Sequence, residues 1–175
     1  FAVDEFDLPR NLKLSIHSGS DKFSIYAPIR RALKSFDAGL HIKTAGTTWL
    51  EEIIALAASG GAGLETAKEI YAKALEDIDE LCEPYKTVID IDRANLPSAD
   101  TVRNWSGEQF ANTVKHEQSC ESYNPNMRQL LHVGYKIAAQ MGNSYLDALR
   151  QNEKIIAEHV THNIYERHIK PLFID

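Results

Sequence analysis

An imidazole, two hydroxyls, a carboxylate and an ammonium group lie within six consecutive residues near the start of the printed sequence. The segment HSGSDK at residues 17–22 follows an apolar, strand-like stretch, LKLSI, at residues 12–16. In parallel α/β folds the carboxyl end of a strand delivers the next residues to the ligand-binding face. Small residues let a ligand approach the backbone, and the amide groups that open the next helix favour an anion, as does Lys22.

A second segment of similar chemistry, KTAGTT at residues 43–48, closes the strand-like stretch GLHIKTAG at residues 39–46. Gly46 and the hydroxyls of Thr47 and Thr48 repeat the combination of small and hydrogen-bonding groups. Two such turns side by side predict a site for a polyhydroxylated, negatively charged small molecule.

The histidines are the candidate metal ligands. We expect RQLLHVGYKIAAQMG at residues 128–142 to be another strand-to-helix junction, with His132 at the turn as His17 is at the first. A histidine near a strand end is more often a structural hydrogen-bonding residue, and a ligand role for His41, inside its strand, is less expected still. His159, His162 and His168 lack the spacing of a metal-binding helix, so we interpret them as surface residues.

Each charged group also has an ordinary structural interpretation. Asp21 is a candidate base or a helix cap, and Lys22 is an anion partner or a solvated side chain. Lys43 could act as a Schiff-base amine or extend along the surface with its ammonium in water. Asp90 and Asp92 form a carboxylate pair, but two acids in a turn are usually solvated.

Two consecutive units of strand, polar turn and amphipathic helix predict a parallel α/β sheet, because a crossover helix joins parallel strands. The expected helices are residues 23–36 and 47–59, the second capped by Thr47 and ended by Gly60 and Gly61. The rest is predicted to be mostly helical, from residues 64–82 to terminal helices that Pro171 stops. Residues 87–91 are a strand or an irregular segment, and Ser98 and Ser106 are expected caps.

Composition limits the class of protein. The 175 residues are 43% hydrophobic and 25% charged, which suits one soluble domain. A net charge of −6 without a Lys/Arg run argues against nucleic-acid binding, and no apolar stretch reaches the roughly 20 residues of a membrane helix. We therefore expect a cytoplasmic protein with reduced Cys82 and Cys120. No P-loop, dinucleotide fingerprint or G-x-S-x-G is found, which argues against nucleotide-driven and serine-hydrolase chemistry.

Four separated stretches resemble one family when taken together in order. LKLSIHSGSDKFSIY, DAGLHIKTAGTTWLEE, YNPNMRQLLHVGYKIAAQMG and NIYERHIKPLF are similar to the tagaturonate epimerase family of bacterial hexuronate C4-epimerases, over about Asn11 to Phe173. The resemblance implies a metal-dependent, barrel-like isomerase that interconverts tagaturonate and fructuronate. Since the chain begins at Phe1 and family members are longer, we expect residues 1–175 to be one domain, the C-terminal part of a longer (β/α) barrel: α/β, partly TIM-barrel-like, with a largely helical C-terminal part.

The implied reaction constrains the mechanism. The C4 hydrogen of a 2-keto hexuronate is β to the ketone, so enolisation alone cannot remove it. We favour retro-aldol cleavage and re-closure of the C3–C4 bond, which needs stabilisation of an enediolate and a base for the C4 hydroxyl. The expected metal ligands are His17 and His132, holding a divalent ion of Zn, Mn, Fe, Co or Ni. The expected catalytic residues are Asp21 and Lys43, and the substrate-binding residues are Ser18, Ser20, Lys22, Thr44 and Thr47.

Two other functions stay open. One is a metal-dependent sugar-acid aldolase or keto-sugar isomerase, which free three-carbon fragments would reveal. The other is a non-catalytic sugar-acid binding module, which would bind a uronate without needing a metal. In each case the partner is a small sugar acid, and an oligomer is compatible with the sequence.

Overall fold

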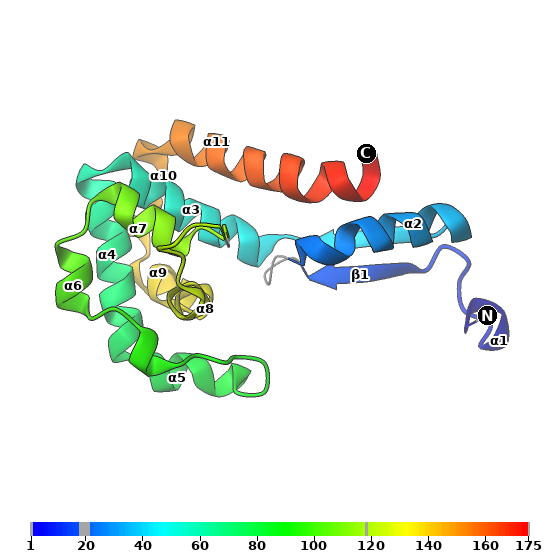
Figure 1. Cartoon of the computed structure of the whole chain (residues 1–175), viewed down its shortest axis with the longest axis horizontal. Coiled ribbons are helices and arrows are strands. Elements are labelled where there is room, and N and C mark those ends of the chain that lie inside the picture. Colours follow the sequence, from blue (N-terminus) through cyan, green and yellow to red (C-terminus); the bar gives the residue numbers. More distant parts are fainter. Residues whose placement is uncertain (1, 18–21, 118, 175) are drawn as a thin grey trace. The chain divides into compact units, whose positions relative to one another are not determined.

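The chain folds into two compact units. The computed structural model describes residues 2–17, 22–117 and 119–174. One unit comprises Phe1–Thr47 with His162–Asp175, and the other comprises Thr48–Thr161 (Figure 1). Both strands belong to the first unit, whereas the described part of the second is built from helices and the segments that join them. The predicted site residues are therefore distributed over two units.

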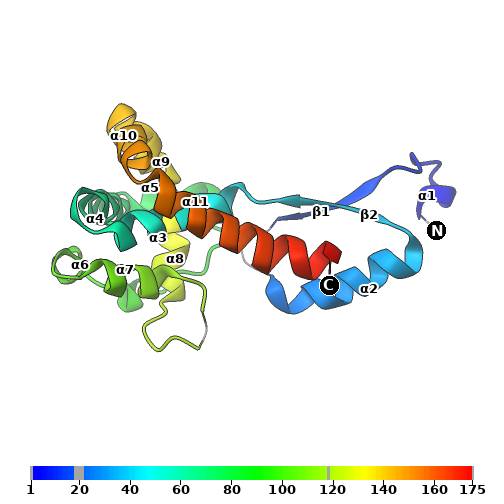
Figure 2. The same ribbon diagram turned by 90° about the horizontal axis from the view of Figure 1, so that it is seen from above.

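The first unit is organised around two parallel strands. β1 (Lys13–His17) pairs with β2 (Gly39–Lys43) in a register that runs from Lys13 opposite Gly39 to His17 opposite Lys43. η1 (Phe23–Ile25) and α2 (Tyr26–Phe36) make the crossover that parallel strands need, and α2 runs alongside the strands (Figure 2). This confirms the predicted parallel α/β unit to within a few residues at each boundary.

The two faces of this sheet differ in chemistry, because successive side chains of a strand point to opposite faces. The residues of one face are apolar: Leu14, Ile16, Leu40 and Ile42. The residues of the other face are Lys13, Ser15, His17, Gly39, His41 and Lys43, and all of them except half-buried Gly39 are exposed. Leu14 is 69% exposed, so the apolar face is only partly covered within the described residues.

The C-terminal helix continues further than the sequence predicts. Proline removes a backbone donor and crowds the preceding turn of an α-helix, so Pro171 was expected to stop the helix. Instead, η4 is a π-helix over Asn163–Ile174 with Pro171 inside it. The wider π turn, with its hydrogen bonds from residue i to i−5, is the form that this segment adopts around the proline. η4 packs against α2, and Arg30 Nη2 donates to the Ile174 carbonyl oxygen at 3.2 Å.

The first unit also contains α1 (Ala2–Glu5), and the second unit is a bundle of helices packed around α4 (Gly61–Glu76). α3 (Ala45–Ser59) begins in the first unit, and Leu50, Ile53, Ile54 and Leu56 on it have no exposed surface. The other helices are α4 (Gly61–Glu76), α5 (Ile78–Cys82), η2 (Glu83–Tyr85), η3 (Arg93–Asn95), α6 (Ala99–Arg103), α7 (Gly107–Val114), α8 (Pro125–Val133), α9 (Tyr135–Met141), α10 (Asn143–Gln151) and α11 (Glu153–His162). The apolar side chains of α3, α4, α7 and α8 share one core.

The expected strand-to-helix junction at residues 128–142 is wrong in its strand, because RQLLHV lies in α8, whereas a helix, α9, does follow. The Asn124 side chain accepts from the backbone N–H groups of Asn126 and Met127 at 2.9 and 3.0 Å, and Pro125 occupies the first turn. An asparagine cap followed by proline favours a helix start over a strand. Residues 87–91 form an irregular segment and not a strand, which was one of the two alternatives predicted for them. The described fold is therefore mixed α/β and mostly helical, and the barrel stays a prediction.

Other local predictions from the sequence are confirmed in part. α3 begins at Ala45, so Thr47 is not its cap. Gly60, with a positive φ of 70°, follows the last residue of α3 as predicted, whereas Gly61, with φ 48°, is the first residue of α4. Both cysteines are free thiols, as predicted. Over the described residues, no helix combines the length and apolarity needed to cross a membrane.

The predicted serine caps are confirmed. Ser98 accepts from the Thr101 N–H group, and Ser106 forms a reciprocal capping box with Gln109. The Gln109 N–H group donates to Ser106 Oγ at 3.2 Å, and the Ser106 N–H group donates to Gln109 Oε1 at 2.8 Å. These bonds satisfy two donors at the start of α7.

Replacing Ser106 tests this cap. Ser106→Ala should lower the free energy of unfolding by about 1 kcal/mol, because the Gln109 N–H group loses its acceptor. Ser106→Asp, which keeps an acceptor and adds a negative charge at a helix N-terminus, should retain the stability. Urea denaturation measures both, and equal loss in the two variants would contradict the assignment.

Candidate functional site

The ends of β1 and β2 bring two predicted site residues together. His17 and Lys43 are register partners, so their side chains leave the same face of the sheet from strands that lie about 4.8 Å apart. Both residues are exposed, and half-buried Thr44 follows at once. Sequence reasoning placed these groups at neighbouring strand ends, and the parallel register confirms that placement.

The side chain of Lys22 also reaches the carboxyl end of β1. Its ammonium donates to the carbonyl oxygen of His17 at 2.9 Å, although five residues separate the two positions. Lys22 and Lys43 therefore both lie close to the carboxyl end of β1. Two lysines at one strand end suit a carboxylate ligand.

The remaining predicted residues of these turns differ in what can be said of them. Ser18, Ser20 and Asp21, which were predicted to bind substrate or act as a base, lie outside the described residues. Thr47 has no exposed surface in the first turn of α3. Its role in substrate binding stays a prediction.

A buried aromatic cluster holds the segment that follows the first turn. His168 on η4 is fully buried, with its ring centroid 5.2 Å from that of Phe23 and 5.7 Å from that of Tyr26. Its Nδ1 lies 3.0 Å from the Asn163 carbonyl oxygen, and the Arg167 guanidinium lies 4.1 Å from the centre of the Phe23 ring. The prediction that His168 is a surface residue is wrong.

This cluster gives His168 a positioning role. Phe23 begins η1 directly after Lys22, so packing Phe23 against His168 on η4 fixes the start of the crossover that leads into α2. The prediction that His168 is a surface residue failed for a physical reason. A period of 3.6 residues per turn, which holds for an α-helix, assigns residues of a π-helix to the wrong face of the helix. The one signal that this face of η4 is buried was Leu172, which lies four residues after His168 and is itself buried.

His132 is not where the sequence analysis expected it. It lies near the end of α8, half-buried, in the unit formed by Thr48–Thr161, whereas His17 lies in the other unit. The prediction that His132 ends a strand is wrong, because RQLLHV continues a capped helix. Its assignment as a metal ligand stays a prediction.

A metal centre needs three or more protein ligands in most catalytic sites. Among residues 2–17, 22–117 and 119–174, no three His, Cys, Asp or Glu side chains gather in a way that could hold a metal ion. The described residues therefore do not form the implied centre by themselves, and a centre that includes His17 would draw its other ligands from elsewhere.

Sequence reasoning missed two carboxylates on α3. Glu51 is only 4% exposed and its Oε2 lies 3.8 Å from His159 Nδ1, while Glu52 Oε2 accepts from the Tyr145 hydroxyl at 2.7 Å. Burial, and then the charge of Glu52, raise the pKa of Tyr145. Two acids inside the otherwise apolar run WLEEIIALAA were the available signal, because buried carboxylates need partners.

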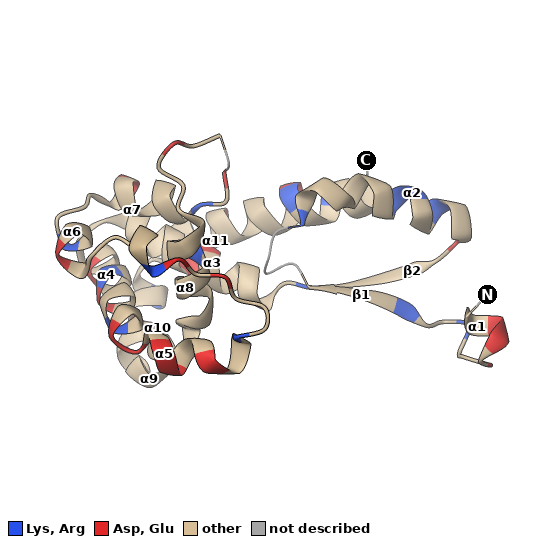
Figure 3. Ribbon diagram, turned by 60° about the horizontal axis from the view of Figure 1, so that its bottom comes forward, with Lys and Arg blue, Asp and Glu red and all other residues tan. Residues whose placement is uncertain are grey.

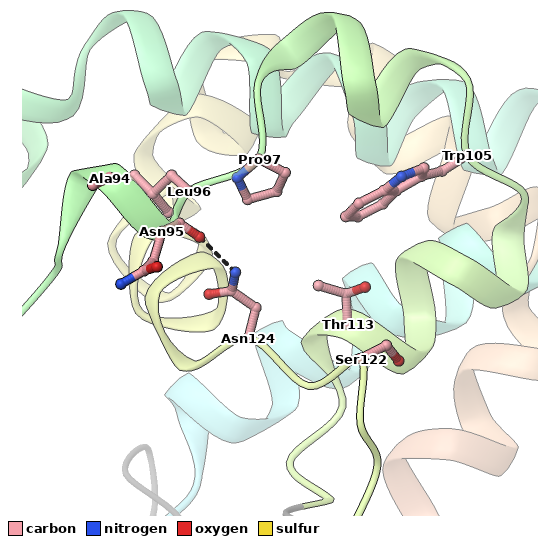
Figure 4. Close-up of a pocket in the computed structure, with 8 residues that line it drawn as sticks. All are labelled: Ala94, Asn95, Leu96, Pro97, Trp105, Thr113, Ser122 and Asn124. Atoms are coloured by element: carbon pink, nitrogen blue, oxygen red, sulfur yellow. Dashed lines mark hydrogen bonds between the residues drawn. The ribbon is translucent and has the colours of Figure 1, made fainter.

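The second unit has a pocket of about 410 Å³ beside Trp105. Figure 4 shows Pro97, Asn95 and Asn124 around the hollow, with Thr113 and Ser122 facing Trp105. Its polar groups serve the fold: Asn124 Nδ2 donates to the Asn95 carbonyl oxygen at 2.7 Å, and Thr113 Oγ1 donates to that of Gln109 at 2.8 Å. Of the residues singled out for chemistry, none is among the described residues that line it.

The loop that supplies Ser122 also carries a free thiol. Cys120 Sγ lies 3.1 Å from Ser122 Oγ, and hydrogen bonds from the Ser122 hydroxyl and the following backbone amides lower the pKa of Cys120. Burial raises the pKa of the other thiol, Cys82. The two cysteines should therefore differ in reactivity, because the thiolate is the nucleophile.

Comparison with known proteins connects these features to one family. A family model described as tagaturonate epimerase (UxaE) matches residues 6–172. The tagaturonate/fructuronate epimerase of Thermotoga maritima is 32% identical over 161 residues, which are 90% of this chain and 29% of that protein.

Solved structures agree over almost the whole chain. The native structure of the fructuronate-tagaturonate epimerase UxaE from Cohnella laeviribosi superimposes with a TM-score of 0.71 at 25% identity. A glycerol complex of the same enzyme gives 0.69 at 28% identity. Each comparison covers 97% of this chain and 32% of the other, so the chain spans about a third of the length of these relatives.

Removing the buried imidazole tests its positioning role. His168→Ala should lower the free energy of unfolding by about 2–3 kcal/mol, because it leaves a cavity between aromatic rings. The control His162→Ala changes an exposed histidine and should stay within about 0.5 kcal/mol of the parent. Thermal unfolding followed by circular dichroism compares the two, and similar small shifts would rule out the packing assignment.

Alkylation rates test the difference between the thiols. Iodoacetamide at neutral pH should modify Cys120 faster than Cys82, since a lowered pKa increases the thiolate fraction and a raised pKa decreases it. Ser122→Ala should slow the reaction at Cys120 and leave Cys82 unchanged. Peptide mass spectrometry over time separates the two sites, and faster modification of Cys82 would contradict the prediction.

Proposed function

Since the chain belongs to the tagaturonate epimerase family, we propose that it supplies part of the substrate site of an enzyme that interconverts tagaturonate and fructuronate. The observation that carries this proposal is the pairing of β1 and β2, which sets His17 beside Lys43 at one end of the sheet. Lys22 adds a second ammonium group there through its bond to the His17 carbonyl oxygen. A hexuronate carries one carboxylate and several hydroxyls, which are the groups such a site binds.

The substrate carboxylate is held by the two ammonium groups. Charge-assisted hydrogen bonds to a carboxylate are about twice as strong as neutral ones, and Lys22 and Lys43 are the cations at this end of the sheet. Thr44, directly after β2, binds a neighbouring hydroxyl. The residues expected from the sequence to complete this binding are Ser18, Ser20 and Thr47.

The reaction we propose is retro-aldol cleavage followed by re-closure. A base takes the proton of the C4 hydroxyl, the C3–C4 bond breaks, and its electrons pass to the C2 ketone as an enediolate. The C4 aldehyde turns over, C3 attacks its other face, and the proton returns to the C4 oxygen. Nothing is consumed, and only the configuration at C4 changes.

The proposed site residues have different roles in this reaction. Asp21, expected from the sequence as a candidate base, is the proposed acceptor of the C4 hydroxyl proton. Binding the carboxylate at Lys22 and Lys43 keeps the aldehyde fragment in place while it turns, which prevents its loss. The divalent ion implied by the resemblance stays an expectation, and no step here is assigned to it.

Turnover by the complete protein tests the proposal. The complete protein should convert tagaturonate to fructuronate, and Lys43→Met should lower kcat/KM at least tenfold because the carboxylate loses a charged partner. Lys34→Met, which changes an exposed lysine on α2 that is not among the proposed site residues, is the matched control and should match the parent. NMR of the sugar acids follows both epimers.

The same experiment separates the alternatives. Free three-carbon fragments at equilibrium would identify an aldolase instead of an epimerase. Binding of either sugar acid without any conversion, with or without added Mn²⁺ or Zn²⁺, would favour a binding module.

A further inference from the structure

The polar face of the sheet extends beyond the strand ends. On this face the register pairs His17 with Lys43 in a first row, Ser15 with His41 in a second, and Lys13 with Gly39 in a third. Because residues i and i+2 of a strand share a face, successive rows lie about 6.7 Å apart. The face is therefore a strip of hydrogen-bonding groups that runs along the strands, from the proposed carboxylate site at their carboxyl ends toward their amino ends.

This strip is cationic within an acidic chain. The formal net charge of the whole sequence is −6, yet neither KLSIH nor GLHIK contains an acidic residue. Figure 3 shows blue positions and no red on β1 and β2. Such a local excess of positive charge raises the local concentration of an anionic ligand.

The side chain of Lys13 covers the third row. A Cβ built on Gly39 would lie 2.8 Å from Lys13 Cγ and 3.2 Å from both Cδ and Cε. The aliphatic part of Lys13 therefore lies across the glycine, on the polar face. This covers the third row and leaves the first two rows, with His17, Lys43, Ser15 and His41, as the accessible part.

Two rows match the length of one sugar acid. A six-carbon chain has five bonds of about 1.5 Å and, zigzagged, spans roughly 6 Å from its carboxylate to its far carbon. A hexuronate with its carboxylate at Lys43 thus reaches the row of Ser15 and His41 with its keto end. A three-carbon acid bound at the same place does not.

We propose that His41 and Ser15 form the second half of the substrate site and bind the keto and terminal hydroxyl groups of a six-carbon sugar acid. This inference rests on the proposed function, because it takes the carboxylate position from it. His41, which the sequence analysis set aside as a strand-interior residue, becomes the group that contacts the end of the substrate where the enediolate forms. Ser15 lies opposite it in the register and binds the neighbouring hydroxyl.

Ligands of two lengths test the proposal on the complete protein. Calorimetry with D-galactonate, a six-carbon acid, should show roughly tenfold weaker binding to His41→Ala and Ser15→Ala, since each variant removes a hydrogen-bonding partner. Binding of D-glycerate, a three-carbon acid, should be unchanged in both variants and weakened in Lys43→Met. His41→Gln keeps a hydrogen-bonding group and should recover part of the affinity for galactonate.

Controls and turnover decide between the outcomes. His162→Ala should bind both acids like the parent, and thermal midpoints check that each variant is folded. If the parent epimerises tagaturonate but His41→Ala and Ser15→Ala keep its kcat/KM and galactonate affinity, the inference is overturned and the function stands. If galactonate binding depends on His41 without any epimerisation, the inference stands and the proposed reaction fails. If the parent neither binds nor converts a hexuronate, both are overturned.

Discussion

The parallel pairing of β1 and β2 is the constraint on which the first unit depends. A parallel pair cannot be joined by a tight turn, so the chain must leave His17, cross through α2 and return at Gly39. The same pairing puts both strand ends at one edge, which is why two short polar segments about 26 residues apart in sequence can act on one ligand. Shifting one strand by a single residue would send His41 and Lys43 to the apolar face.

The crossover is held in place by groups from the far end of the chain. His168 and Arg167 contact Phe23, and Arg30 bonds the Ile174 carbonyl oxygen. Residues more than 140 positions apart therefore determine how the chain enters and leaves α2. The aromatic and cationic contacts are made by Phe23 and Tyr26 at the start of the crossover, so they contribute to the stability of the first unit.

Sequence patterns predicted the elements whose periods are regular. The strand-like stretches LKLSI and GLHIKTAG, and the caps at Ser98 and Ser106, identified strands and helix starts close to their observed positions. RQLLHV was misassigned because a short apolar run fits a strand and a buried helix equally well, and the cap at Asn124 decides between them. The burial of His168 and Glu51 was missed, because a π-helix departs from the 3.6-residue period and the partner of Glu51 is far away in the sequence. The available signals were limited to Leu172 and to the two acids in WLEEIIALAA.

The exposed apolar side of the two-stranded sheet has a practical consequence for anyone handling this polypeptide by itself. Leu14 on β1 is 69% exposed and Phe36, the last residue of α2, is 81% exposed. Each strand of the pair has one edge without a strand neighbour within the described residues. Such edges are templates for intermolecular β-pairing, and the apolar residues beside them promote it. Aggregation during expression or storage would begin at β1 and β2, the strands that carry the proposed sugar-acid site.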